Sequence, residues 1–144
     1  NINRSAFFSE AYIPDIDQRM LMYRRLARMS AESEINEFRS ELLDRFGPMP
    51  VEAKNLLLKI RIKVSAQKAA VSRLDLKNGT LFLYFSEAHL QHPDRLVDMI
   101  VNSGGRFELS PEQILKTRLV RTGAGGPLTQ TKNILKEIAQ RVNG

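Results

Sequence analysis

Cysteine and tryptophan are absent from the sequence, and histidine occurs only twice, as His89 and His92. Without thiols the chain can form no disulfide, no thiolate metal site and no cysteine nucleophile. Two histidines three residues apart, with no further ligand motif beside them, do not predict a metal site, so we expect both on the surface. Because the chain has no cysteines that could form disulfides, it does not require an oxidising compartment. We therefore expect a reducing, cytoplasmic one.

Long apolar runs and catalytic motifs are lacking as well. No stretch approaches the roughly 18 apolar residues that cross a membrane, so we expect no membrane association. No Gly-x-Ser-x-Gly sequence is present, and the loop Gly123 to Gly126 lacks the Gly-Lys-Ser/Thr ending of a nucleotide-binding loop. The sequence therefore predicts no catalytic residue and no cofactor. Because the first residue is Asn and not Met, we expect a piece of a longer protein.

Basic residues outnumber acidic ones, 22 Lys and Arg against 16 Asp and Glu, which gives a formal net charge of +6. A basic surface binds phosphate by releasing counterions, so a basic nucleic-acid-binding module is one open alternative. Its candidate residues are Lys54, Arg61 and Lys68, at spacings of seven, with Arg24, Arg25 and Arg28 on an earlier segment. No aromatic residues interleave with that stripe, which favours a solvated helix face over a base-stacking site.

Helical periodicity begins after an apolar arm over residues 6–13 that ends at Pro14. Asp15 or Asp17 can cap a helix that runs to about Met29, and Arg24, Arg25 and Arg28 take its polar side. The expected apolar face is Ile16, Met20, Tyr23 and Ala27, widened by Met22 and Leu26. Arg19 falls between the apolar positions, so we expect its guanidinium either to pair with Asp44 or to reach water from the edge of the core.

A second amphipathic helix is expected from an N-cap at Ser30 to Phe46, where Gly47 and Pro48 end it. Its apolar stripe is Ile35, Phe38, Leu42 and Phe46, and its acidic stripe is Glu34, Glu37, Glu41 and Asp44. The helix dipole favours acids in the first turn but disfavours them near the last one. Glu37, Glu41 and Asp44 therefore have no local explanation, and we predict that they contact a partner, a solvated acidic face being the alternative.

The remaining periodicity predicts an α+β fold, with the N-terminal helices packed with a small, mostly antiparallel sheet, and a C-terminal helix. Residues 50–70 favour one long helix over two strands. Asn78-Gly79 predicts a hairpin turn between strands 71–77 and 80–85, with leucines of both strands on one face. A short helix from Pro93 carries Leu96, Val97, Ile100 and Val101, strands follow at 106–109 and 114–120, and the last helix opens at Pro127.

Three sequence runs closely resemble the C-terminal domain of the bacterial transcription-repair coupling factors (Mfd). They are Tyr12 to Asp15, Arg19 to Ala27, and Glu41 to Pro50, and the similarity extends over about residues 6–120. The residues of the motif are Arg19, Tyr23, Arg45, Phe46, Gly47 and Pro50. The resemblance implies a regulatory domain over residues 1–122, with residues 123–144 as a Gly-rich joint and terminal helix of the same domain.

The resemblance also implies a function. In this family the full protein is an ATP-dependent DNA translocase, with ATP and Mg bound in its motor domains, that removes stalled RNA polymerase and recruits nucleotide-excision repair through UvrA. The C-terminal domain is expected to be non-catalytic and to hold no cofactor. We expect it to dock on the N-terminal UvrB-like module, mask the UvrA-binding surface and keep the protein inactive, with Glu37, Glu41 and Asp44 at the contact.

Overall fold

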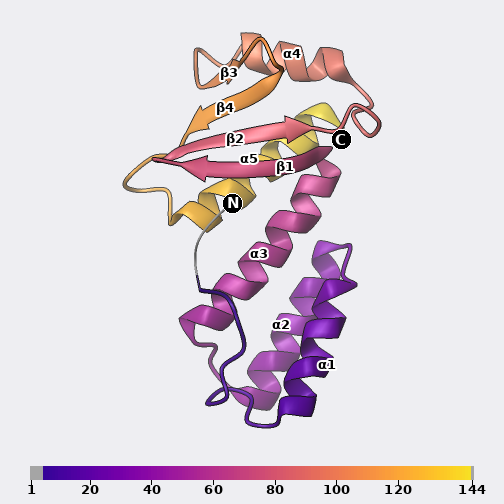
Figure 1. Ribbon diagram of the computed structural model, residues 1–144, viewed down its shortest axis with the longest axis vertical. Helices are drawn as coiled ribbons and strands as arrows, with labels where there is room; N and C mark the ends of the chain where they lie inside the picture. The colour runs from indigo at the N-terminus through magenta and orange to yellow at the C-terminus, as the bar shows by residue number, and fades with distance from the viewer. Residues whose placement is uncertain (1–4, 144) are drawn as a thin grey trace. The chain divides into compact units, whose positions relative to one another are not determined.

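The computed structural model describes residues 5–143. In chain order its elements are α1 (Ile16–Ala27), α2 (Glu32–Phe46), α3 (Val51–Lys68), β1 (Val71–Lys77), β2 (Thr80–Phe85), α4 (Pro93–Val101), β3 (Phe107–Leu109), β4 (Ile114–Arg118) and α5 (Pro127–Val142) (Figure 1). The chain divides into two compact units at the boundary between Val64 and Ser65. We call them the helical unit and the sheet unit. The expected α+β class is confirmed.

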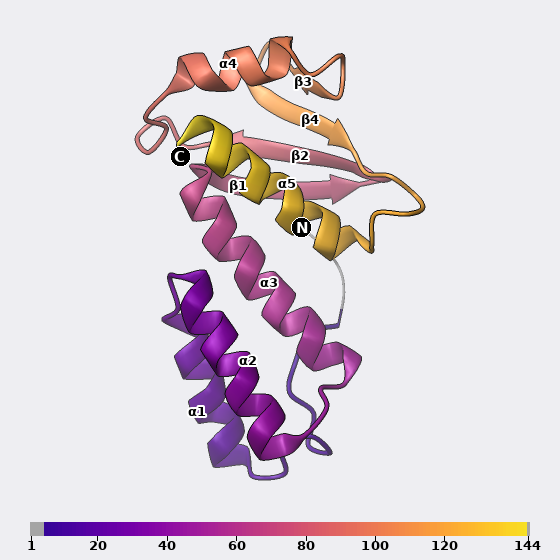
Figure 2. The same cartoon turned by 180° about the vertical axis from the view of Figure 1, so that it is seen from behind.

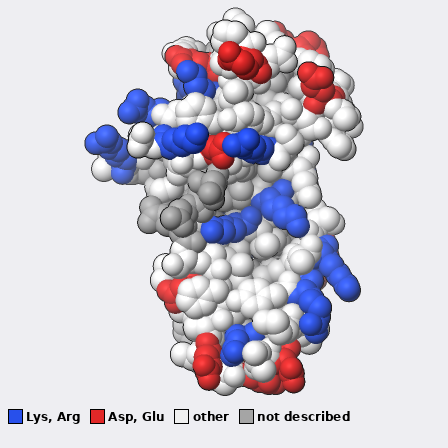
Figure 3. All heavy atoms as spheres, in the orientation of Figure 1, with Lys and Arg blue, Asp and Glu red and all other residues white. Residues whose placement is uncertain are grey.

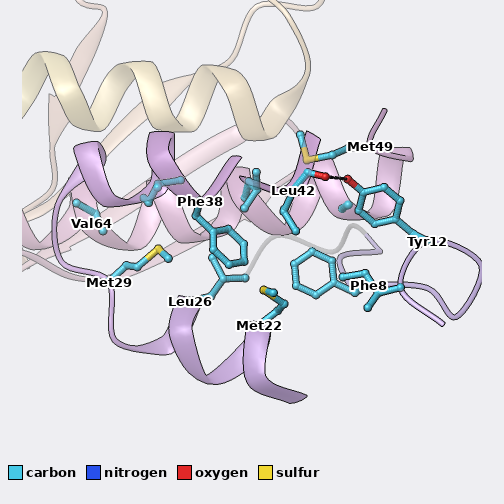
Figure 4. Packing of buried hydrophobic residues seen from close by; sticks show 13 residues of the cluster. Phe8, Tyr12, Met22, Leu26, Met29, Phe38, Leu42, Met49 and Val64 are labelled. Atoms are coloured by element: carbon cyan, nitrogen blue, oxygen red, sulfur yellow. Dashed lines mark hydrogen bonds between the residues drawn. The ribbon is translucent and has the colours of Figure 1, made fainter. Parts of the chain in front are cut away.

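The helical unit is held together by an apolar core in which aromatic and methionine side chains meet (Figure 4). Phe8 of the N-terminal arm lies with its ring centroid 6.3 Å from that of Phe38 on α2. Met22 and Leu26 of α1 are buried against this cluster, as is Leu42 of α2. Burying one such side chain stabilises the fold by about 1.5–3 kcal/mol, so this core fixes the helical unit.

The buried face of α1 is only partly the expected one, since Tyr23, Met22 and Leu26 pack in the core but other residues of that face do not. Ile16 and Met20 are 58% and 42% exposed, and Ala27 is exposed too, whereas Met22 and Leu26 are buried. The helix is thus rotated about its axis so that Met22 and Leu26, in its C-terminal half, face the core. Arg19 lies on the same side of α1 as Met22 and Leu26, and its guanidinium donates to the backbone carbonyls of the arm.

The start of α2 also differs from the expected one by a residue. The N-cap is Ala31, whose side chain caps nothing, instead of Ser30. The carboxylate of Glu34 reaches back and accepts hydrogen bonds from the backbone N–H groups of Ser30 and Ala31, both at 3.1 Å. Glu34 thus supplies the returning half of a capping box, while its own backbone N–H donates to the Ala31 carbonyl. The single long helix expected over residues 50–70 is confirmed as α3.

The four strands form an antiparallel sheet in the order β1-β2-β4-β3. Asn78 and Gly79, at φ 52° and 77°, make the tight turn between β1 and β2 that the sequence predicted. The register places Leu74 opposite Leu83, so the leucines of the two strands share one face as expected.

Helix α5 covers this leucine face of the sheet, in front of the strands in Figure 2 and behind them in Figure 1. Leu135 and Ile138 of α5 are fully buried, as are Leu83 and Leu115 of the strands. Helix α4 contacts α5 and β3 and buries Leu96 and Met99.

The expected apolar face of α4 is only partly correct. Val97 and Val101 are 49% and 73% exposed, because the face that meets α5 and β3 is the one centred on Leu96 and Met99.

Candidate functional site

Glu41 lies at the centre of an ion-pair cluster that joins α1 to α2. Its two carboxylate oxygens accept hydrogen bonds from the two terminal nitrogens of Arg25 at 2.8 and 2.7 Å. Arg45, one turn further along α2, donates to the same carboxylate at 2.9 Å. The Arg25 and Arg45 guanidinium groups lower the pKa of Glu41 from 4.5 to about 2. Glu41 is therefore a fixed anion across the neutral pH range.

The two arginines are themselves held in place by aromatic rings. The guanidinium carbon of Arg25 lies 4.9 Å from the ring centroid of Phe38, and that of Arg45 lies 5.0 Å from the ring of Phe46. The hydrogen bonds to Glu41 raise the pKa of Arg25. Each cation above a ring adds about 0.5–1 kcal/mol at a partly exposed site. Glu41 thus belongs to an ordered surface cluster and is not a freely moving side chain.

The sequence pattern did not predict the pairing of Arg25 with Glu41. Arg25 was expected on the side of α1 away from the core, together with Arg24 and Arg28. Because the helix is rotated, Arg25 lies half-buried at the seam with α2, while Arg24 and Arg28 remain exposed. The signal in the sequence was its spacing from Met22, since residues three apart share a helix face.

Glu37 and Asp44 flank Glu41 on α2, and both are exposed. Among the residues that the structure describes, neither carboxylate forms an ion pair. The expected pairing of Asp44 with Arg19 is wrong: Arg19 instead donates to the carbonyl oxygens of Ile13 and Pro14, at 2.6 and 3.1 Å. The carbonyls at the end of the arm lie closer in sequence than α2 does and satisfy the same donor. Glu37 and Asp44 remain open to an external cation.

The turn after α2 is locked by the N-terminal arm. Gly47 adopts φ 82° and ψ −165°, a conformation essentially confined to glycine. Its carbonyl accepts a hydrogen bond of 2.9 Å from the hydroxyl of Tyr12, which also donates to the Leu42 carbonyl at 3.3 Å (Figure 4). The ring of Tyr12 packs on that of Phe46 at 5.8 Å. After the turn, the Pro50 carbonyl accepts the first helical hydrogen bond of α3, from Lys54.

Tyr23 completes the attachment of the arm. Its hydroxyl accepts a 2.7 Å hydrogen bond from the backbone N–H of Phe8, and the two rings lie 5.2 Å apart. Tyr23 and Arg19 therefore act on the arm, while Phe46 and Gly47 act on the turn. Of the motif residues that carried the family resemblance, Arg45 contacts the acidic edge of α2 directly, through Glu41.

Two of the basic residues considered for nucleic-acid binding form ion pairs within the domain. Arg61 is half-buried and pairs with Glu32 at 3.5 Å, and Arg25 belongs to the Glu41 cluster. Within residues 5–143, no group of three or more His, Asp or Glu side chains is placed to hold a metal ion. Nor does any helix in this range have the length and apolar character needed to cross a bilayer.

Comparison with known proteins identifies the family of this chain. The TRCF domain family matches residues 2–96. The chain is 30% identical over 105 residues to the transcription-repair-coupling factor of Escherichia coli strain K12, which covers 73% of the chain and 9% of that protein. It is 28% identical over 116 residues to the factor of Rickettsia conorii, covering 80% of the chain and 10% of that protein. The chain thus spans about a tenth of the length of these curated relatives.

The fold has a counterpart among solved structures. The crystal structure of a C-terminal domain of transcription-repair coupling factor superposes with a TM-score of 0.78 at 18% identity, covering 98% of this chain and 90% of that one. At this identity the likeness concerns the fold, whereas the family match concerns the sequence. The chain therefore belongs to the TRCF domain family of the transcription-repair-coupling factors, as its sequence motifs predicted.

Proposed function

We propose that this chain is the non-catalytic, autoinhibitory C-terminal domain of its parent protein. It docks on the parent's N-terminal UvrB-like module and masks the surface that receives UvrA. The parent is an ATP-dependent DNA translocase that removes stalled RNA polymerase and recruits nucleotide-excision repair. Membership of the TRCF domain family supports the parent's role, and the observation that carries the docking surface is the exposure of Glu37 and Asp44 beside the fixed Glu41 cluster.

A reversible lock requires a contact of modest strength. Exposed ion pairs contribute about 0–1 kcal/mol each, so several of them shift a two-state equilibrium by a few kcal/mol and still release. Glu37 and Asp44 make the direct contacts with basic side chains of the module. Glu41 holds Arg25 and Arg45 in place, so that these cations do not move onto the two neighbouring carboxylates. Its own contact with the module is limited to the exposed third of its side chain.

Charge reversal at the two open carboxylates tests this proposal. Glu37→Lys/Asp44→Lys turns two attractive contacts into repulsive ones, and we expect the affinity of the chain for the separately produced N-terminal module to fall at least tenfold. The matched control is Glu87→Lys/Glu112→Lys, which changes the net charge equally at two exposed acids of the sheet unit. Calorimetric titration measures both, and in the parent protein the first variant should bind UvrA more tightly than wild type does.

Glu41→Lys is not a clean test, because the new ammonium group would lie between two guanidinium groups and destabilise the helical unit. Equal affinity of the wild type and the Glu37→Lys/Asp44→Lys variant would refute the docking surface. A loss of the same size in the control variant would show that only the net charge matters.

A further inference from the structure

Successive side chains of a strand point to opposite faces of the sheet, so every second residue lies on the face away from α5. Phe82, on the central strand β2, lies opposite Asp75 of β1 and Lys116 of β4, and Thr80 lies opposite Arg118. Tyr84 follows two residues after Phe82, so the two rings share this face. Both are half-buried. Two aromatic side chains at alternate positions of a central strand, with cations on the next strand, make this face unlike a purely solvated one.

A hollow of about 430 Å³ opens over this face. Its lining includes Phe82, Thr80 and Glu108 and, as cationic members, Arg106, Lys116 and Arg118. A flat apolar ring with cationic side chains around it suits a ligand that combines a planar base with phosphate.

Most charged side chains of this face are basic, and most of these basic side chains form no ion pair with a described residue. Lys77, Lys116 and Arg118 form no ion pair with any residue between 5 and 143, whereas Arg106 is bound to Glu137 at 2.8 Å. Asp75 pairs with Arg73 at 2.9 Å, and the Arg73 guanidinium lies 4.9 Å from the Tyr84 ring. Figure 3, which views the side opposite α5, shows basic side chains gathered over the strands. Glu108 is the one acid among the described residues that line the hollow.

We propose that this sheet face binds single-stranded nucleic acid, with one base stacked on Phe82 in the hollow and the flanking phosphates on Lys116 and Arg118. A sheet face presents its side chains at a spacing of about 7 Å along the strand, which suits successive unpaired bases. A duplex hides the faces of its bases and cannot stack on Phe82. An acidic peptide uses the cations but gains nothing specific from the ring. The proposal is independent of the docking surface, since it uses other residues in the other unit.

Binding is measured by fluorescence anisotropy of the 144-residue chain with a labelled thymidine 12-mer. Two to three phosphate contacts predict a slope of log affinity against log salt of about −1.4 to −2.1 for a single strand. A fourfold rise in salt, from about 50 to 200 mM, should therefore weaken binding roughly tenfold. The same titration with a duplex 12-mer and with a 12-residue polyglutamate distinguishes the three ligand classes.

Three variants locate the site. Lys116→Gln/Arg118→Gln should weaken binding about tenfold or more, and Phe82→Leu, which keeps an apolar side chain but removes the ring, about fivefold or more. Phe82→Leu should also abolish the change in emission of a 2-aminopurine base placed in the oligonucleotide, which reports stacking. The matched control, Arg39→Gln/Lys63→Gln, removes two exposed cations of the helical unit and should change the affinity less than twofold.

Lys116→Gln/Arg118→Gln tests the proposal even if Phe82→Leu perturbs folding. Arg118 is exposed and Lys116 is half-buried at the surface, so replacing them leaves the core intact. Wild-type affinity in Lys116→Gln/Arg118→Gln, or an equal loss in the control, overturns the proposal. So does duplex or polyglutamate binding as tight as that of the single strand, since neither can stack a base on Phe82.

Discussion

Replacing Glu41 by Gln removes the charge that joins α1 to α2 and leaves a side chain of nearly the same shape. The pKa of Glu41 falls from 4.5 to about 2 in the folded chain, which corresponds to roughly 3 kcal/mol before solvent screening is counted. The side chain is 33% exposed, so solvent screening reduces this figure. We expect Glu41→Gln to lower the free energy of unfolding of the helical unit by about 1–2 kcal/mol at pH 7.

The pH dependence of this effect has a definite sign. The pKa of Glu41 is lower in the folded than in the unfolded chain, so the stabilisation is present in full above pH 4.5. It is lost as the pH falls from 4.5 through about 2, because the folded state then takes up the proton as well. The difference between wild type and Glu41→Gln should therefore shrink over this interval and vanish below it.

Urea unfolding followed by far-UV circular dichroism, repeated at several pH values, measures this difference. Glu37→Gln is the control: its carboxylate is exposed and unpaired among the described residues, and its loss should change the free energy of unfolding by less than about 0.5 kcal/mol. If Glu41→Gln is as stable as the wild type at pH 7, the ion-pair cluster does not stabilise the fold. If the difference persists at pH 2, it does not arise from the charge.

Three further substitutions test the turn, the arm and the hairpin. Gly47→Ala meets no steric clash but places a side chain at φ 82°, so we expect a loss of about 1–3 kcal/mol in urea unfolding. Tyr12→Phe leaves the Gly47 carbonyl without its donor and should cost about 1 kcal/mol; because burial raises the pKa of Tyr12, absorbance titration of the wild type should show a tyrosine that ionises above pH 10. Asn78→Ala puts alanine at φ 52° in the hairpin turn, and its melting temperature should fall by a few degrees.

Features fixed by neighbouring residues could be predicted from the sequence. The positive φ of Gly47 and of the Asn78-Gly79 turn follows from what those residues tolerate, whatever lies around them. The leucine face of the first two strands follows from their alternation once the turn fixes the register. The acidic edge of α2 was likewise visible, because a helix of 15 residues repeats its faces several times.

Features that depend on how one helix is rotated against another could not be predicted in this way. The apolar residues of α1 spread over a wide face, and its periodicity does not show which part of that face is buried against α2. The rotation of α1 then moves Arg25 to the seam and creates its bond with Glu41. The buried face of α1 and the position of Arg25 are thus linked, because both follow from the same rotation of the helix. The hollow beside Phe82 needs the register of β4 against β2, which crosses more than thirty residues of chain.

The two proposed surfaces differ in charge and lie in different units, which makes them separable by experiment. Glu37→Lys/Asp44→Lys acts on the helical unit and should leave binding of the thymidine 12-mer unchanged at moderate salt, because neither residue lines the hollow of the sheet unit. Lys116→Gln/Arg118→Gln acts on the sheet unit and should leave the affinity for the N-terminal module unchanged. If each variant affected both ligands equally, the net charge of +6 would explain both, and neither surface would be specific.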